Sequence, residues 1–248
     1  MWKKRDILVP VLALVLCAGI AHASLGDKLK TSAIDIGAKI ISDPGDFLYN
    51  LHMNNEDRVP LPTGRVFQFG TNLIPNLFPL GEFGLAGKLR AVKEHGGLPQ
   101  VDVRLGGWNS MVLLAVDQAK MYGYHAGLGI AASAHPQMRI YGGYQFSQLR
   151  TDIKVPEDAN DTTSDMDITG ATLPDTIKIG LSEHFFYAGA EMMRTAEKKI
   201  AVEMGYGLTK SKLIARITWI RKNFDTSLAF YPESAWALWP LVNVQWRW

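Results

Sequence analysis

Apolar side chains recur at every second position from residue 65 to the end of the chain, in segments of roughly ten residues. This period places apolar side chains on one face of a β-strand and polar or small side chains on the other. The clearest apolar faces are Phe67, Phe69, Thr71 and Leu73; Phe83, Leu85, Gly87 and Leu89; Tyr122, Tyr124, Ala126, Leu128 and Ile130; and Ile200, Val202, Met204 and Tyr206. No segment after residue 23 is uniformly apolar over the ~18 residues that a spanning helix needs. If this chain enters a membrane, it must do so as a closed barrel, because an open sheet edge cannot be hydrated in lipid.

The alternation predicts an all-β fold of about ten antiparallel strands, within a range of roughly eight to twelve. One segment is ambiguous. Ile177 and Ile179 favour odd positions, whereas Phe186 and Ala188 favour even ones, so residues 177–194 hold a bulge or two strands. The predicted strands are 65–75, 82–94, 101–115, 121–133, 137–153, 177–194, 198–208, 211–222, 225–232 and 236–248.

The first 23 residues have the three regions of a secretory signal peptide. The basic run Lys3-Lys4-Arg5 is followed by an apolar stretch from Ile7 to Ile20, and Ala21-His22-Ala23 is a cleavage pattern that a signal peptidase accepts. An uncleaved anchor helix is the alternative. Cleavage would leave 23 basic and 23 acidic residues and would remove Cys17, the only cysteine. The neutral mature chain gives no indication of nucleic-acid binding, and its lack of cysteine suits an oxidising compartment.

Residues 24–62 predict an amphipathic helix followed by a linker. Apolar residues recur there at spacings of three and four, which places them on one helical face. The segment Ser42-Asp43-Pro44-Gly45 is typical of a helix stop. The apolar stripe can pack against the membrane interface, the barrel mouth, a partner protein or its own chain. The candidate interaction residues of this helix, which spans 25–41, are Leu25, Leu29, Ile36 and Ile40.

The last predicted strand ends on an aromatic residue, with alternating apolar positions before it. Its apolar face consists of Val242, Val244, Trp246 and Trp248. This strand resembles the C-terminal assembly signal of Gram-negative outer-membrane β-barrel proteins, with Trp in place of the commoner final Phe. By pattern, the resemblance covers the signal peptide and residues 63–248. It implies a cell outer-membrane protein that contacts lipid and the barrel-assembly machinery, with both ends of the chain in the periplasm. A soluble β-sandwich is the alternative.

The predicted strand order also indicates an orientation. If the last strand ends in the periplasm, the longest connection, 156–176, falls on the outer side and the shorter turns fall on the periplasmic side, as in outer-membrane barrels. These turns are near 95–100, 134–136, 194–198 and 222–225. The expected organisation is a signal peptide over 1–23, a periplasmic helix and linker over 24–62, and a barrel over 63–248.

The inward face of the predicted barrel is polar, and its basic residues outnumber its acidic ones. The candidate lumen-lining residues are Lys88, Arg90, Arg104, His125, Arg139, Glu191, Glu203 and Arg216. Two interpretations stay open. Charges such as Glu203 and Arg216, on consecutive strands, can pair and fill the lumen with a polar core. Alternatively, the basic excess lines a narrow passage that favours anions.

No catalytic or cofactor site is predicted. His184 has Glu183 beside it, but neighbours on a strand point to opposite faces, so this carboxylate cannot easily orient the imidazole. The chain has no glycine-rich phosphate loop, no zinc motif and no cysteine spacing for a metal. The acidic loop 156–176 resembles the start of a calcium loop, but Thr176 stands where the bidentate Glu belongs, so a solvated surface loop is expected.

Two function classes follow. The first is a structural or interaction component of the cell envelope, which anchors a partner envelope protein through residues 25–41. The alternative is a narrow, porin-like channel for small, preferentially anionic solutes, lined by Arg90, Arg104, Arg139 and Arg216. Neither class is an enzyme, and neither requires a cofactor or a nucleic acid.

Overall fold

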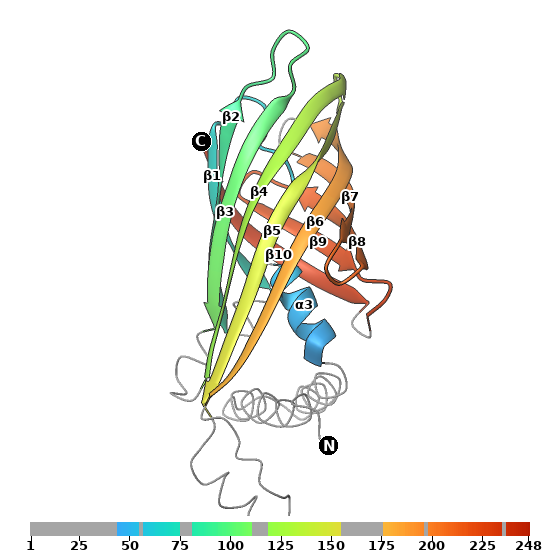
Figure 1. Ribbon diagram of the computed structural model, residues 1–248. Helices are drawn as coiled ribbons and strands as arrows, with labels where there is room; N and C mark the ends of the chain where they lie inside the picture. The colour runs from blue at the N-terminus through green and yellow to red at the C-terminus, as the bar shows by residue number, and fades with distance from the viewer. Residues whose placement is uncertain are drawn as a thin grey trace, which may run out of the picture.

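The computed structural model describes residues 44–54, 57–74, 81–110, 119–154, 176–195, 198–234 and 237–248. In these residues, ten antiparallel strands close into a barrel in which each strand pairs with its neighbours in the chain and β1 pairs with β10 (Figure 1). The elements are α3 (Pro44–Asn54), β1 (Phe67–Ile74), β2 (Glu82–Val92), β3 (Gln100–Ser110), β4 (Ala119–His135), β5 (Met138–Lys154), β6 (Thr176–Thr195), β7 (Lys198–Gly207), β8 (Lys212–Ile220), β9 (Phe224–Phe230) and β10 (Leu238–Arg247). The predicted all-β barrel of about ten strands is confirmed.

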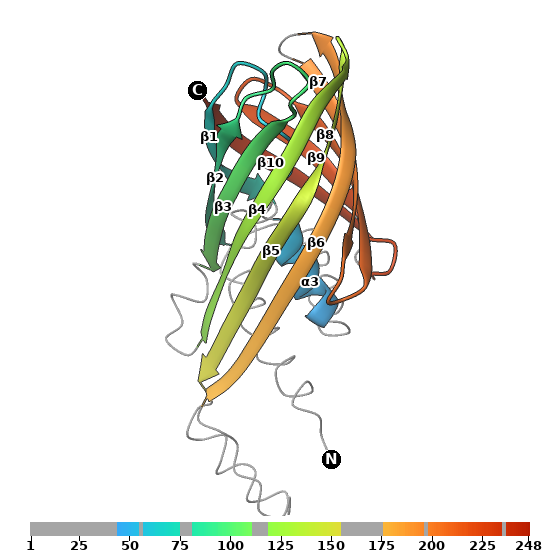
Figure 2. The ribbon, with the colours of Figure 1, turned by 45° about the horizontal axis from the view of Figure 1, so that its top comes forward.

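The two ends of the barrel differ in their connections. At one end, here called the turn end, short segments join the strands at 93–99, 136–137, 196–197 and 221–223. The C-terminal Trp248 lies at this end, where its carbonyl oxygen accepts from the Val66 amide at 2.7 Å. The opposite end, here called the loop end, carries the connection 155–175 between β5 and β6. Figure 2 shows that β4, β5 and β6 reach beyond the other strands at the loop end.

Residues 177–194 lie in one strand, as in the predicted list, and the alternative of two strands is wrong. β6 pairs with β5 without a break from Met192↔Met138 to Thr176↔Lys154. The register shift against β7 lies at the turn end of β6, between Met193 and Thr195. The shift of apolar residues from odd to even positions within this strand has a physical cause. Leu181 packs against the buried apolar core inside the barrel, whereas Phe186 is exposed on the outside, so apolar residues occupy both faces of this strand.

The exterior of the barrel is apolar around its circumference. Outward residues such as Leu105 on β3, Leu128 on β4 and Met204 on β7 are more than half exposed. Aromatic side chains lie toward the turn end, where Phe69 stacks on Trp246 with ring centroids 4.8 Å apart. An apolar band with aromatic residues near its edge is the exterior that a lipid-embedded barrel requires. In architecture, the resemblance to outer-membrane β-barrel proteins is confirmed.

None of the described residues forms a helix that is long and apolar enough to cross a membrane. The helix α3 instead lies inside the barrel, between the wall made by β4–β6 and the strands opposite it (Figures 1 and 2). The sequence pattern of this segment predicts a helix stop and a linker instead. Pro44 is the first helical residue, where proline is best tolerated, and Asp46 in the first turn complements the helix dipole. The predicted amphipathic helix 25–41 lies outside the described residues.

The apolar exterior allows a stability test with a matched control. Leu105, in mid-strand, is 62% exposed, and Leu98, in the turn before β3, is 64% exposed. In lipid, Leu105→Arg is expected to lower the free energy of unfolding by about 2–4 kcal/mol, and Leu98→Arg by at most about 1 kcal/mol. Urea unfolding in phospholipid vesicles measures both. In a soluble β-sandwich, the two substitutions would have equal and small effects.

Candidate functional site

The lumen holds part of the protein's own chain. The described residues 44–54 and 57–62, here called the plug, run from the loop end to the turn end. At the loop end, Asp46 forms an ion pair with Lys212 at the start of β8. At the turn end, the Leu61 carbonyl oxygen accepts from Arg90 at 2.9 Å and from Arg139 at 3.1 Å. The plug therefore occupies the length of the barrel.

The helix α3 is buried on every side, from Phe47 to Asn54. Apolar side chains such as Phe47, Leu48 and Leu51 form its core contacts. The polar groups of its last turn bond to the wall, as buried polar groups must. These bonds run from Tyr231 Oη to Asn54 Oδ1 (2.7 Å), from Trp108 Nε1 to His52 Nδ1 (3.2 Å), from Asn72 Nδ2 to the Asn54 carbonyl (3.2 Å) and from Arg216 to the Met53 carbonyl (3.3 Å).

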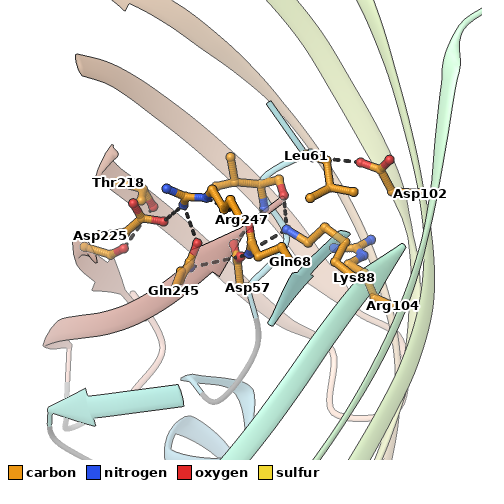
Figure 3. Close-up of polar contacts among 12 residues, drawn as sticks. Asp57, Leu61, Gln68, Lys88, Asp102, Arg104, Thr218, Asp225, Gln245 and Arg247 are labelled. Carbon is orange, nitrogen blue, oxygen red and sulfur yellow. Dashed lines mark hydrogen bonds and ion pairs between the residues drawn. The ribbon is translucent and has the colours of Figure 1, made fainter. Parts of the chain in front are cut away.

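Asp57 connects the plug to the place where the barrel closes. Its carboxylate accepts from Gln68 on β1 at 2.7 Å, from Lys88 on β2 at 3.0 Å and from Gln245 on β10 at 3.1 Å (Figure 3). β1 and β2 are the first two strands of the barrel, and β10 is the last. Figure 3 places Asp57 between the three side chains. The Asp57 side chain of the plug thus bonds to the first and the last strand of the barrel, β1 and β10, at the place where they pair and close it.

Arg58, next to Asp57, forms a further charged contact between the plug and the wall. Its Nε donates to Glu203 on β7 at 2.6 Å, and both side chains are almost fully buried. The guanidinium also stacks on Phe185, 4.6 Å from the ring centroid. A buried, charge-assisted bond of this kind is strong, and the loss of one partner leaves an uncompensated charge in the interior.

Leu61 forms the third contact, through its backbone. Its amide donates to Asp102 Oδ2 at 2.8 Å, and its carbonyl accepts from Arg90, Gln100 and Arg139. Lys88 likewise donates to the Val59 carbonyl. The cationic side chains of the wall therefore bind carbonyl and carboxylate oxygens of the plug.

The eight predicted lumen-lining residues all point into the barrel, and seven of them are buried. Five contact the plug: Lys88, Arg90, Arg139, Glu203 and Arg216. Glu191 instead pairs with Arg139 and Lys199 of the wall. Arg104 instead bonds to Tyr187 and to the Leu128 carbonyl on the wall. Glu203 and Arg216 stand directly opposite each other on β7 and β8, as the sequence predicts, and Glu203 binds Arg58 as well.

Asp57 and Arg58, which form two of the charged contacts of the plug, are not among the predicted site residues. An adjacent acid and base followed by Val59-Pro60-Leu61-Pro62 is typical of an exposed linker. The available signal was the basic excess of the predicted lumen, because buried cations require oxygen partners within the fold.

The remaining candidate residues have different outcomes. Trp246 and Trp248 are exposed on the outer face of β10, and the role of this strand in assembly stays a prediction. Leu25, Leu29, Ile36 and Ile40 lie outside the described residues, and so does the acidic loop up to residue 175. In the part of the chain that the structure describes, no three His, Cys, Asp or Glu side chains lie together as metal ligands would.

The direction of the plug bears on the predicted orientation. α3 begins at the loop end beside Lys212, whereas Trp248 lies at the turn end (Figure 1). Pro44 and the C-terminal residue are thus at opposite ends of the barrel. The expectation that both ends of the chain lie in the periplasm stays a prediction, and the course of the plug does not support it.

Comparisons with known proteins give no close relative. No family model matches the chain, and no curated protein matches it. Among solved structures, it is similar to a KdgM porin in complex with disordered oligogalacturonate, with a TM-score of 0.34 and 8% identity. It is also similar to a second structure of the KdgM porin, with a TM-score of 0.32 and 8% identity. Each match covers 74% of this chain and 98% of the porin.

Proposed function

We propose that this protein is an outer-membrane barrel that acts as a structural or interaction component of the cell envelope, with its lumen closed by the plug. One observation carries the proposal. The basic groups expected to attract solutes, among them Lys88, Arg90 and Arg139, bond to oxygen atoms of residues 57–62. The apolar exterior supports the membrane location.

We further infer that α3 begins at the outer end of the barrel. With the C-terminal strand ending in the periplasm, the loop end is the outer end, and Asp46 in the first turn of α3 pairs there with Lys212.

A narrow, porin-like channel for anions is the second candidate. The wall holds the plug through the Leu61 and Pro62 carbonyls, to which Arg90 donates at 2.9 Å each. A small anion offers such side chains oxygen atoms of the same kind. This function requires the plug to leave its position.

Chemical cross-linking in intact cells tests the interaction role. The test variant replaces Leu25, Leu29, Ile36 and Ile40 by Ser, and the control variant replaces Lys28, Lys30, Asp35 and Lys39 by Ser on the other helical faces. We expect the first variant to lose cross-linked proteins that the second retains. An identical set of products from wild type and both variants would contradict the interaction role, and steady conductance of the intact protein would favour the channel.

A further inference from the structure

The strand pairing is incomplete at one seam of the barrel. β1 pairs with β2 over four positions, from Phe67↔Leu89 to Gly70↔Ala86. Residues 71–74 and 82–85 continue as strands toward the loop end, but they have no ladder partner across this seam. On their far sides they stay paired, 71–74 with β10 and 82–85 with β3. The two strands thus separate within the wall.

A cleft lies at this separation, and residues from both faces of the wall line it. Its lining includes Leu85 and Gly87, which point to the exterior, and Trp108 and His125, which point to the lumen. Small residues line the passage between them: Gly70, Gly84, Ala86, Gly87 and Gly107. A Cβ atom added at Gly87 would meet its nearest neighbours at 4.0 Å, an ordinary van der Waals distance, so a side chain fits at this position.

The outer mouth of the cleft opens on the apolar exterior. Phe83 and Leu85 on one side of it are exposed, and so is Leu105 on the adjacent strand. In a membrane, the molecules that meet this surface are lipids. Strand edges without ladder partners are costly in hydrocarbon, because their N–H and C=O groups lack hydrogen bonds. An occupant with polar atoms as well as an apolar chain would relieve that cost.

The inner end of the cleft is polar and carries groups without partners. His125 is 5% exposed, and its Nδ1 atom has no hydrogen-bond partner among the described residues. The Thr71 hydroxyl oxygen, on the outward face of β1, is also buried without a hydrogen-bond partner among the described residues. Lys88, Arg104 and the Asp57 carboxylate, which pairs with Lys88, line the same cleft. Two cations and one carboxylate leave this end of the cleft positively charged, and the unpartnered Nδ1 atom of His125 lies beside them, so the inner end suits an acidic head group such as a carboxylate or a phosphate.

We propose that the seam between β1 and β2 is a lateral binding site for an amphiphile with an acyl chain and an acidic head. The acyl chain enters from the membrane past Leu85 and Gly87, and the head lies near His125 and Lys88. The site needs the proposed membrane location but neither the interaction role nor the channel. The lateral site would bind a lipid even while the plug fills the lumen along the barrel axis.

Fluorescence quenching by brominated chains tests the site, with Trp108 as the reporter. The full mature protein is inserted into phosphatidylcholine vesicles, and the emission of Trp108 is obtained as wild type minus Trp108→Phe. Dibromostearic acid is added in one arm, and dibromostearoyl phosphatidylglycerol is included in the vesicles in the other. Loss of the Trp108 emission in either arm supports the site, and the arm that quenches identifies the source of the chain as a free fatty acid or a phospholipid.

Two variants make the test specific. Gly87→Phe places a ring at the outer mouth of the cleft, where the acyl chain would enter, and is expected to protect Trp108 from quenching. Ala215→Phe adds the same ring on the outward face of β8, away from the seam, and is expected to change nothing. Unquenched Trp108 in vesicle-inserted wild type would overturn the site and leave the membrane location standing, even if Gly87→Phe did not fold. Failure of wild type to insert would overturn both.

Discussion

Replacement of residues 46–61 by a Gly–Ser linker of equal length is expected to convert a closed barrel into an anion-selective pore. The linker keeps the chain connected but removes Asp57, Arg58 and the apolar side chains of α3. Lys88 and Arg139 then lose their carboxylate and carbonyl partners, and water replaces them. A narrow lumen with unpaired basic side chains favours anions.

Planar-bilayer recordings of the intact and replaced proteins measure this effect. The intact protein is expected to give no steady current steps, whereas the replaced protein gives steps with a reversal potential of the anion-selective sign. Heat-modifiable migration in detergent gels serves as the folding control for both. If the replaced protein folds but gives no current, the side chains of the barrel wall fill the lumen without the plug. A preference for cations would contradict the role assigned to the basic residues.

Arg58→Ala is expected to lower the free energy of unfolding by about 3–5 kcal/mol, because it leaves Glu203 as a buried charge without its closest partner. Glu203 is buried and accepts from Arg58 at 2.6 Å. Urea unfolding in phospholipid vesicles measures the change.

Two further variants separate the ion pair from general effects. The double substitution Arg58→Met with Glu203→Gln removes both charges and is expected to recover most of the lost stability. Arg65→Ala alters an exposed basic residue just beyond the plug and is expected to stay within about 0.5 kcal/mol of wild type. If Arg58→Ala were as neutral as Arg65→Ala, the plug would not be held by this contact.

The strands and their faces were predictable because period-two alternation is a local signal. Phe67, Leu85 and Met204 face outward in the structure, as the pattern indicates. The ambiguity at 177–194 arose because Leu181 packs against an apolar core that the sequence pattern does not show. A strand that faces lipid outside and apolar residues inside loses its alternation, so only the pairing with β5 reveals it as continuous.

The plug was not predictable by the same means. α3 is buried on all sides, so it has no polar stripe to mark it as amphipathic, and Pro44 was assigned to a stop although it begins the helix. Its partners are remote in sequence, as in the bond between Asn50 and Ser234. The wall residues were predicted at the correct positions, but their chemistry suits a backbone carbonyl as well as a solute anion. The open seam between β1 and β2 was not predictable from the sequence for a different reason. The alternation of apolar and polar residues continues through 71–74 and 82–85, although these segments do not pair with each other.

Accessibility of a single lumen thiol tests most directly whether the protein's own chain occupies the lumen. Ser147 is fully buried inside the barrel, and its hydroxyl lies 3.6 Å from Met53 Sδ of the plug. Because the only cysteine is Cys17, in the predicted signal peptide, Ser147→Cys provides one thiol in the mature chain. A membrane-impermeant thiol reagent added to outer-membrane vesicles is expected to leave it unmodified in the intact protein and to modify it once the linker replaces residues 46–61. Rapid modification in the intact protein would show that water fills the lumen and would contradict the closed barrel.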